Sequence, residues 1–109
     1  MFRWVWVLAL AAAPAWGQAR SYEGREAAAL SCAHGLVTTS ALLGAGGTVS
    51  PADREFASII AAAILTRYVS GTARQKLAAL DALAARETGA QTVARFRVEL
   101  GRCQRQFPL

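Results

Sequence analysis

The sequence predicts an all-α protein, a small up-and-down bundle of about four helices linked by one disulfide. Apolar residues, many of them alanine, recur at spacings of three and four, which is the period of a helix buried on one face. The alternating β-branched and aromatic residues that would indicate strands are not found. Two cysteines fall on the expected apolar faces of the first and last helices.

The N-terminal segment, residues 1–19, is expected to be a cleaved secretory signal peptide. Arg3 precedes an apolar run over residues 4–13, and the small residues Ala15 and Gly17 follow at the spacing that a signal peptidase requires. This run is shorter than the roughly twenty apolar residues needed to span a bilayer as a helix. The sequence therefore predicts export, either to the periplasm or out of the cell.

The remaining residues, 20–109, are expected to form one helical domain. The chain has 109 residues, with 12 Lys and Arg, 7 Asp and Glu, 2 Cys and 1 His. This length leaves no room for a second substrate domain, and the Cys, His and acidic residues are too few for a polynuclear or closed metal site. From residue 18 onward, 11 basic minus 7 acidic residues give a net charge of +4. No metal or cofactor is expected.

The first helix is expected over residues 22–43 and ends in a glycine-rich loop over residues 44–48. This loop has no lysine and does not match a phosphate-binding pattern, so it is interpreted as a connector. Gly35 and Thr38 are expected to face away from the apolar stripe of the helix. The residues expected on that stripe are Ala29, Leu30, Cys32, Ala33, Leu36, Val37 and Leu43.

The second helix has the clearest start signal. Ser50 is a favoured cap, Pro51 suits the first helical position, and Asp53 supplies an acidic residue in the first turn. Its body, residues 56–65, is apolar nearly all round. A helix without a polar face is buried centrally, paired with another chain, or in lipid.

Two alternatives follow from this apolar second helix. The first is a homodimer, and the residues expected in its interface are Phe56, Ile59, Ile60 and Ile64. The second is a small membrane-associated hairpin with residues 27–52 as the partner segment. The hairpin is disfavoured because the second helix has only eleven uncharged residues in its body and the partner segment contains His, Ser, Thr and four glycines.

The third helix is expected over residues 72–87, with Gly89 closing it. Its expected apolar residues are Ala73, Leu77, Leu80, Leu83 and Ala84. In the fourth helix, apolar residues recur at spacings of 3, 4, 3 and 4, which is typical of a bundle seam, and Pro108 prevents continuation. The seam residues are Val93, Phe96, Leu100, Cys103 and Phe107. Short connections after the second and third helices predict antiparallel neighbours.

The two cysteines are expected to form a disulfide. Cys32 lies on the apolar face of the first helix and Cys103 on that of the fourth, and an exported chain meets an oxidising compartment. In the chain-entropy account, closing a loop of this length stabilises the fold by roughly 4 kcal/mol. The spacing is unlike a local Cys-x-x-Cys pair, so a redox-active role is not expected.

Catalytic residues are hard to assemble from this sequence, and we expect no enzyme. The single imidazole is His34, which could pair at helical spacing with the hydroxyl of Ser31 or Thr38. Cys32 points about 200° away from it on a helix. Glu23 and Glu26 are explained by the positive end of the first helix dipole.

A basic bias of the fourth helix is the remaining feature with functional content. The predicted binding surface consists of Arg95, Arg97, Arg102 and Arg105. All but Arg97, which flanks the seam, are expected to project away from it, with only Glu99 opposing them. This pattern suits an acidic protein partner or an anionic envelope surface. Nucleic acid is not expected, because the chain is exported and no aromatic residue lies among the exposed arginines.

The leading hypothesis is an exported, non-enzymatic protein-interaction module of accessory, immunity or chaperone-like type. In overall plan alone, the chain resembles small exported helical proteins with two cysteines, among them acid-stress chaperones and secretion-system immunity proteins. No motif of theirs is matched, so no residue role is transferred. The alternatives are a protein that binds an envelope surface or an anionic ligand, the membrane hairpin, and an enzyme in which His34 meets residues of a second copy.

Overall fold

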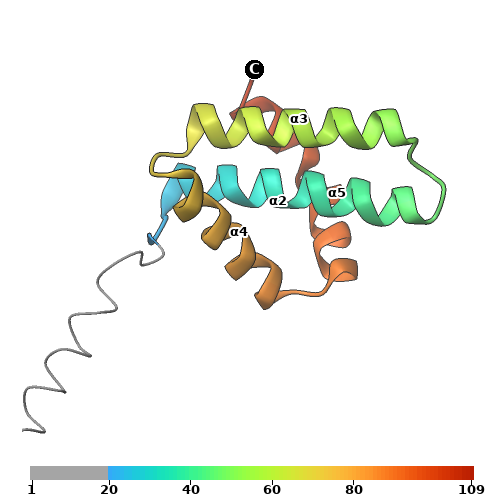
Figure 1. The fold of residues 1–109 in the computed structure, drawn as a ribbon, viewed down its shortest axis with the longest axis horizontal. Coiled ribbons are helices and arrows are strands. Elements are labelled where there is room, and N and C mark those ends of the chain that lie inside the picture. Colours follow the sequence, from blue (N-terminus) through green and yellow to red (C-terminus); the bar gives the residue numbers. More distant parts are fainter. Residues whose placement is uncertain (1–19) are drawn as a thin grey trace, which may run out of the picture.

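The computed structural model describes residues 20–109, and the expected signal peptide over residues 1–19 lies outside the described residues. The described chain forms four α-helices and no strand (Figure 1). The helices are α2 (Gly24–Ala45), α3 (Pro51–Tyr68), α4 (Ala73–Arg86) and α5 (Gly89–Gln106). The predicted all-α class with four helices is confirmed, and the predicted helix ranges agree with these to within a few residues.

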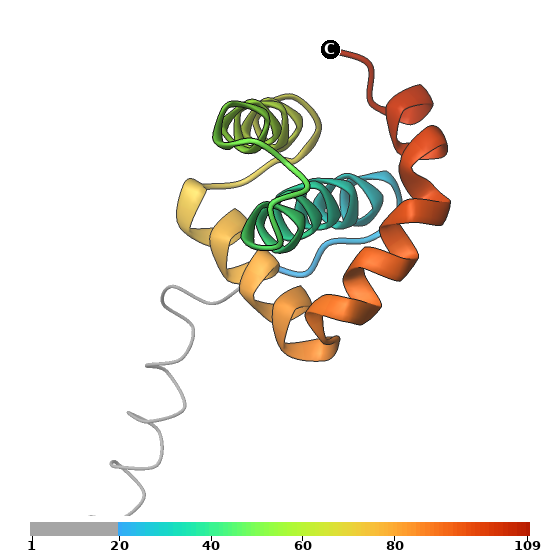
Figure 2. The same cartoon turned by 90° about the vertical axis from the view of Figure 1, so that its right-hand side faces the viewer.

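Helix α2 is the central element, and each of the other three helices packs against it (Figure 2). A central position had been one of the expectations for α3, because that helix is apolar nearly all round. α2 is suited to the centre because the small residues Ala29, Ala33 and Gly35 let neighbouring helices approach it closely, and all three are buried. The predictions that Gly35 faces away from the core and that Val37 is buried are therefore wrong, since Val37 is 40% exposed.

The chain changes direction by 117° between α3 and α4. α3 runs back along α2, whereas α4 leaves α3 at an angle and packs on α2, so the antiparallel pairing that the short connection after the second helix predicted is not formed (Figure 1). The short connection after α3 thus brings α4 to the central helix. α3 and α5 both lie on α2, and apart from the contact of the Tyr68 ring with Phe107 they do not pack closely on each other.

The helix starts are set by side-chain caps. The Ser50 hydroxyl accepts a hydrogen bond from the Asp53 amide at 3.1 Å, as predicted. Thr72 and Thr88 form capping boxes with glutamines three residues later, which the sequence analysis missed although the Thr-x-x-Gln signal is present. Gly89, expected to close the third helix, instead begins α5.

The apolar residues of α3 divide into a set buried against α2 and a set exposed to solvent. The buried residues are Ala57, Ala61 and Ile64, which face α2. Phe56 and Ile59 are 62% and 58% exposed. Ile64 is 3% exposed, so it is not available for the predicted homodimer contact. Helix α3 therefore packs through two alanines and one isoleucine and presents two other large apolar side chains to solvent.

The hydrophobic core lies along the N-terminal half of α2. Ala29, Leu30 and Ala33 pack there with residues from the end of α3 and with Phe107. At the rim of this core, Glu26 accepts hydrogen bonds of 2.6 Å from both the amide and the hydroxyl of Ser70. These bonds lower the pKa of Glu26. Glu26 thus ties α2 to the α3–α4 connection, a role that the helix-dipole interpretation did not include.

One helix, α2, is long and apolar enough to cross a membrane, and α3 with α4 passes the same test only as a sharply bent pair. Core helices of soluble proteins also pass this test. In the described part of the chain, α2 is surrounded by α3, α4 and α5 (Figure 2). The arrangement therefore gives no support to the predicted alternative of a hairpin.

Candidate functional site

The disulfide between α2 and α5 is confirmed. Cys32 and Cys103 are bonded, with their Cα atoms 5.8 Å apart and a sequence separation of 71. Next to it, the Phe96 ring lies against Gly35, so closely that a Cβ at position 35 would overlap it. The predicted seam of α5 is thus correct at its buried residues, whereas Leu100 is 38% exposed.

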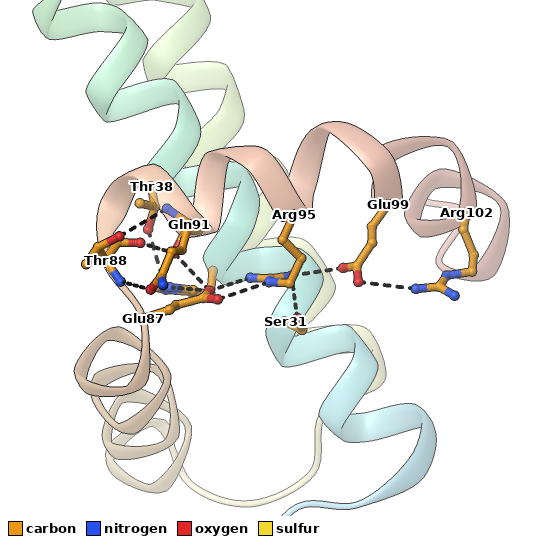
Figure 3. A network of polar contacts seen from close by, with 10 residues as sticks. Ser31, Thr38, Glu87, Thr88, Gln91, Arg95, Glu99 and Arg102 are labelled. Carbon is orange, nitrogen blue, oxygen red and sulfur yellow. Dashed lines mark hydrogen bonds and ion pairs between the residues drawn. The ribbon is translucent and has the colours of Figure 1, made fainter.

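Arg95 does not belong to a solvated basic face, and the prediction that its side chain projects into solvent is wrong. Its guanidinium donates hydrogen bonds to Glu87 at 2.8 Å, to Glu99 at 2.9 Å and to the Ser31 hydroxyl at 2.8 Å (Figure 3). The side chain is 24% exposed. The Glu87 hydrogen bond raises the pKa of Arg95, and the same bond lowers the pKa of Glu87. Arg95 therefore joins α5 to α2 and to the α4–α5 connection.

The other three predicted arginines remain on the surface. Arg97, Arg102 and Arg105 are exposed. Arg102 makes a 3.4 Å ion pair with Glu99, with 61% of its side chain exposed (Figure 3). An exposed pair of this kind contributes little to stability. The accessible basic surface of α5 thus consists of these three residues without Arg95.

His34 is buried beside this network, with 9% of its surface exposed. Its Nε2 lies 3.8 Å from Glu87 and has no hydrogen-bond partner among the described residues. Burial lowers the pKa of His34, while the Glu87 charge opposes that shift. Its Nδ1 lies 3.5 Å from the Thr38 hydroxyl, but the Ser31 hydroxyl is held by Arg95. Of the two expected hydroxyl partners, only Thr38 is near the imidazole.

The described residues contain no group of three or more His, Cys, Asp or Glu that could hold a metal ion. A cavity of about 140 Å³ adjoins the disulfide, with Glu99 and Arg102 among its lining residues. A second cavity, of about 230 Å³, lies beside His34 between α2, α3 and α4. A larger and mainly apolar feature lies between α3 and α5.

An apolar groove of about 320 Å³ separates α3 from α5, with Leu36 of α2 as part of its floor. We call this feature the α3–α5 groove. Its lining residues are Leu36, Asp53, Phe56, Ala57, Ile60, Ile64, Phe96, Leu100, Cys103, Gln104, Phe107, Pro108 and Leu109. The groove was not predicted from the sequence, because the apolar faces of α3 and α5 were expected to take part in separate contacts. The sequence feature that could have indicated the groove is that α3 and α5 each carry more large apolar residues than their contact with α2 buries.

Two arginines continue the rows of residues that line this groove. Arg97 precedes Leu100 by three residues and Gln104 by seven, so the three share one line along α5. Arg67 follows Ile64 by three residues on α3. Both arginines are exposed, and neither takes part in an ion pair within residues 20–109. The groove therefore has a mainly apolar lining with Asp53 as its one charged residue, and an exposed arginine continues the helical line of each wall beyond that lining.

No protein-family model matches the chain, and no curated protein or solved structure shows significant similarity to it. The fold and the groove together define a small all-α, disulfide-linked helical protein.

Proposed function

We propose that the protein is an exported, non-enzymatic protein-interaction module that receives its partner in the α3–α5 groove. The observation that carries this proposal is the groove itself, whose lining is mainly apolar although it opens to solvent. Large apolar patches on small proteins commonly mark interaction sites. The disulfide supports export, because such bonds persist in oxidising compartments.

The accessible residues of the groove are of the kind that anchor protein interfaces. Phe56 is 62% exposed, and Leu109 and Leu100 are 54% and 38% exposed. Burying such side chains contributes about 25 cal/mol for each Å² of apolar surface removed from water. Aromatic and aliphatic anchors near the centre of an interface usually supply most of its binding free energy.

The polar network around Arg95 supports a structural role. Arg95 links Glu87, Glu99 and the Ser31 hydroxyl, which belong to different parts of the fold. Thr92, 1% exposed, also donates a hydrogen bond to Glu87, at 2.8 Å. Groups that satisfy one another in this way hold helices together, so the network favours a non-enzymatic interpretation.

Site-specific photo-crosslinking tests the proposal. A photoreactive residue replaces Leu100, which lines the groove, or Val98, which is 85% exposed and points about 200° away on the same helix. In cells that naturally export the protein, we expect a discrete crosslinked species from position 100 and none from position 98. Equal crosslinking at both positions, or none at either, would contradict the proposal.

A second candidate function is binding to an anionic envelope surface, which the exposed Arg97, Arg102 and Arg105 favour. Replacing all three with Glu changes the net charge of residues 20–109 by six, from +4 to −2. Vesicles with and without anionic lipid measure the effect. If this candidate is correct, the wild type sediments with the anionic vesicles at low salt and the triple variant does not. Equal sedimentation of the two proteins would exclude it.

A further inference from the structure

We infer that the α3–α5 groove binds an amphipathic helix of a partner protein, with acidic residues flanking its apolar stripe. This inference rests on the proposed function and specifies the chemistry of the partner. It depends on the shape of the groove, its openness and the charges beside its walls.

The shape of the groove matches a helix. Helices α3 and α5 both pack on α2 and, apart from the contact of the Tyr68 ring with Phe107 at one end, leave an open apolar groove between them. On α3 the accessible lining runs from Asp53 to Ile60, which is about 10 Å, or two turns, along the helix. This length accommodates apolar anchors at positions i, i+3 or i+4, and i+7 of a bound helix.

The groove is too open to enclose a lipid tail. Pockets that hold small apolar ligands typically bury about 70–90% of the ligand surface. Here the wall residue Phe56 is 62% exposed, and Leu109 at one end is 54% exposed. An acyl chain in the groove would remain in contact with water along one side. A helix would place only its apolar stripe inside and keep its polar side in solvent.

The charges distinguish an acidic partner from a second copy of this chain. Arg97 and Arg67 continue the lining rows of the two walls and make no ion pair in the described chain. Asp53 is the one acidic residue in the lining. A second copy of this chain would bring a like net charge to the groove, because residues 20–109 of each copy carry a net +4. A helix with Glu or Asp beside its apolar residues would instead meet complementary charge.

The experiment uses the full oxidised chain and synthetic amphipathic helical peptides with identical leucine stripes. One peptide has Glu beside the stripe, a second has Lys at the same positions, and a third has the Glu peptide composition in scrambled order. Fluorescence anisotropy at low and high salt measures binding. We expect the Glu peptide to bind about tenfold more tightly than the Lys peptide, with the difference shrinking at high salt. The scrambled peptide should not bind.

Two protein variants locate the binding site. Phe56→Asp should abolish binding, and because Phe56 is largely exposed the variant should keep the circular dichroism of the wild type. Val98→Asp is the matched control, since it adds the same charge at an exposed apolar position outside the groove and should bind normally. The double variant Arg67→Glu with Arg97→Glu should reverse the preference toward the Lys peptide.

Other occupants give different results. Equal affinity for the Glu and Lys peptides, or no reversal in the double variant, overturns the inference that the partner helix is acidic. In that case a crosslink from position 100 still supports the proposed function, a partner bound in the groove. Dimerisation in sedimentation equilibrium that Phe56→Asp abolishes identifies a second copy as the occupant and overturns the inference. Binding to anionic vesicles that Phe56→Asp abolishes, without peptide binding, identifies a membrane and overturns it too.

Discussion

The two long interfaces of α2 differ in what holds them together. Its contact with α5 contains a disulfide, the Phe96 ring against Gly35, and the ion pairs of Arg95 with Glu87 and Glu99. Its contact with α3 is made by the small residues Ala57 and Ala61 together with Ile64, while larger apolar residues of α3 stay exposed. The α2–α5 interface depends on a few particular groups, whereas the α2–α3 interface is made by small side chains and one isoleucine.

This difference indicates where the chain tolerates change. A covalent bond, an aromatic ring against a glycine and a shared guanidinium each depend on one atom or group, so substitutions there should be costly. The outer surface of α3 has no such partners within the described chain, and its exposed Phe56 and Ile59 are available for another molecule. We therefore expect stability to depend on α5 and binding on the groove side of α3.

The largest effect is expected from removing the disulfide. Replacing both Cys32 and Cys103 with Ser should lower the free energy of unfolding by about 4 kcal/mol, because the unfolded chain loses its cross-link across 71 residues. Urea denaturation of the variant and of the oxidised wild type measures the difference. Reduced wild-type protein should behave like the variant. A loss well below 1 kcal/mol would show that α5 is held by its noncovalent contacts.

The next effect is expected at the Gly35 contact. Gly35→Ala places a methyl group where the Phe96 ring lies, and such overpacking should cost about 1–3 kcal/mol. Gly101→Ala is the matched control at an exposed position of α5. There the nearest atom to the new Cβ belongs to the flexible end of Arg105, 3.3 Å away. That control should gain about 0.5–1 kcal/mol from helix propensity. Thermal unfolding compares them, and equal shifts would contradict the close Phe96 packing.

A similar or smaller loss is expected from Arg95→Met. This change leaves Glu87 without its ion pair and should cost about 1–3 kcal/mol, because several hydrogen bonds to a charged group disappear. Arg102→Met removes one exposed pair and should cost less than about 1 kcal/mol. Chemical denaturation of the two variants tests the contrast. If both losses are small, Arg95 does not secure α5.

The smallest effect is expected from the titration of His34. Its pKa is lowered in the fold by burial, so as the pH falls the unfolded chain binds this proton first. The contribution of neutral His34 to stability should therefore decrease below about pH 6.5, until the folded protein is protonated too. His34→Gln should flatten the decline between pH 7 and pH 5. Urea midpoints across this range measure it, and parallel curves for both proteins would contradict the assignment.

Several features were predictable because they depend on local chemistry. Ser50 and Pro51 mark a helix start wherever that helix packs, since the cap satisfies amides of the same segment. The 3- and 4-residue spacings identified four helices, and the positions of Cys32 and Cys103 on apolar faces predicted their disulfide. The Thr-x-x-Gln capping boxes could have been found in the same way.

The candidate site was only partly predictable. The arginines at 97, 102 and 105 are exposed as expected, but helical periodicity could not distinguish Arg95 from them. Arg95 is drawn into the fold by Glu87, which lies in the connection before α5, and by Ser31, 64 residues away on α2. A helical wheel describes one helix, so it contains no information about such distant partners.

By itself, then, the sequence determined the helices, their caps, the buried seam of α5 and the cysteine pairing, because each depends on residues close in the chain or on a simple apolar face. Only the tertiary structure decided that α2 is the central helix, that Arg95 is held while Arg97 is not, and that a groove remains between α3 and α5. The direction of α4 after its 117° turn decides which helices meet on α2. That direction comes from the simultaneous packing of side chains from several helices, which no single segment encodes.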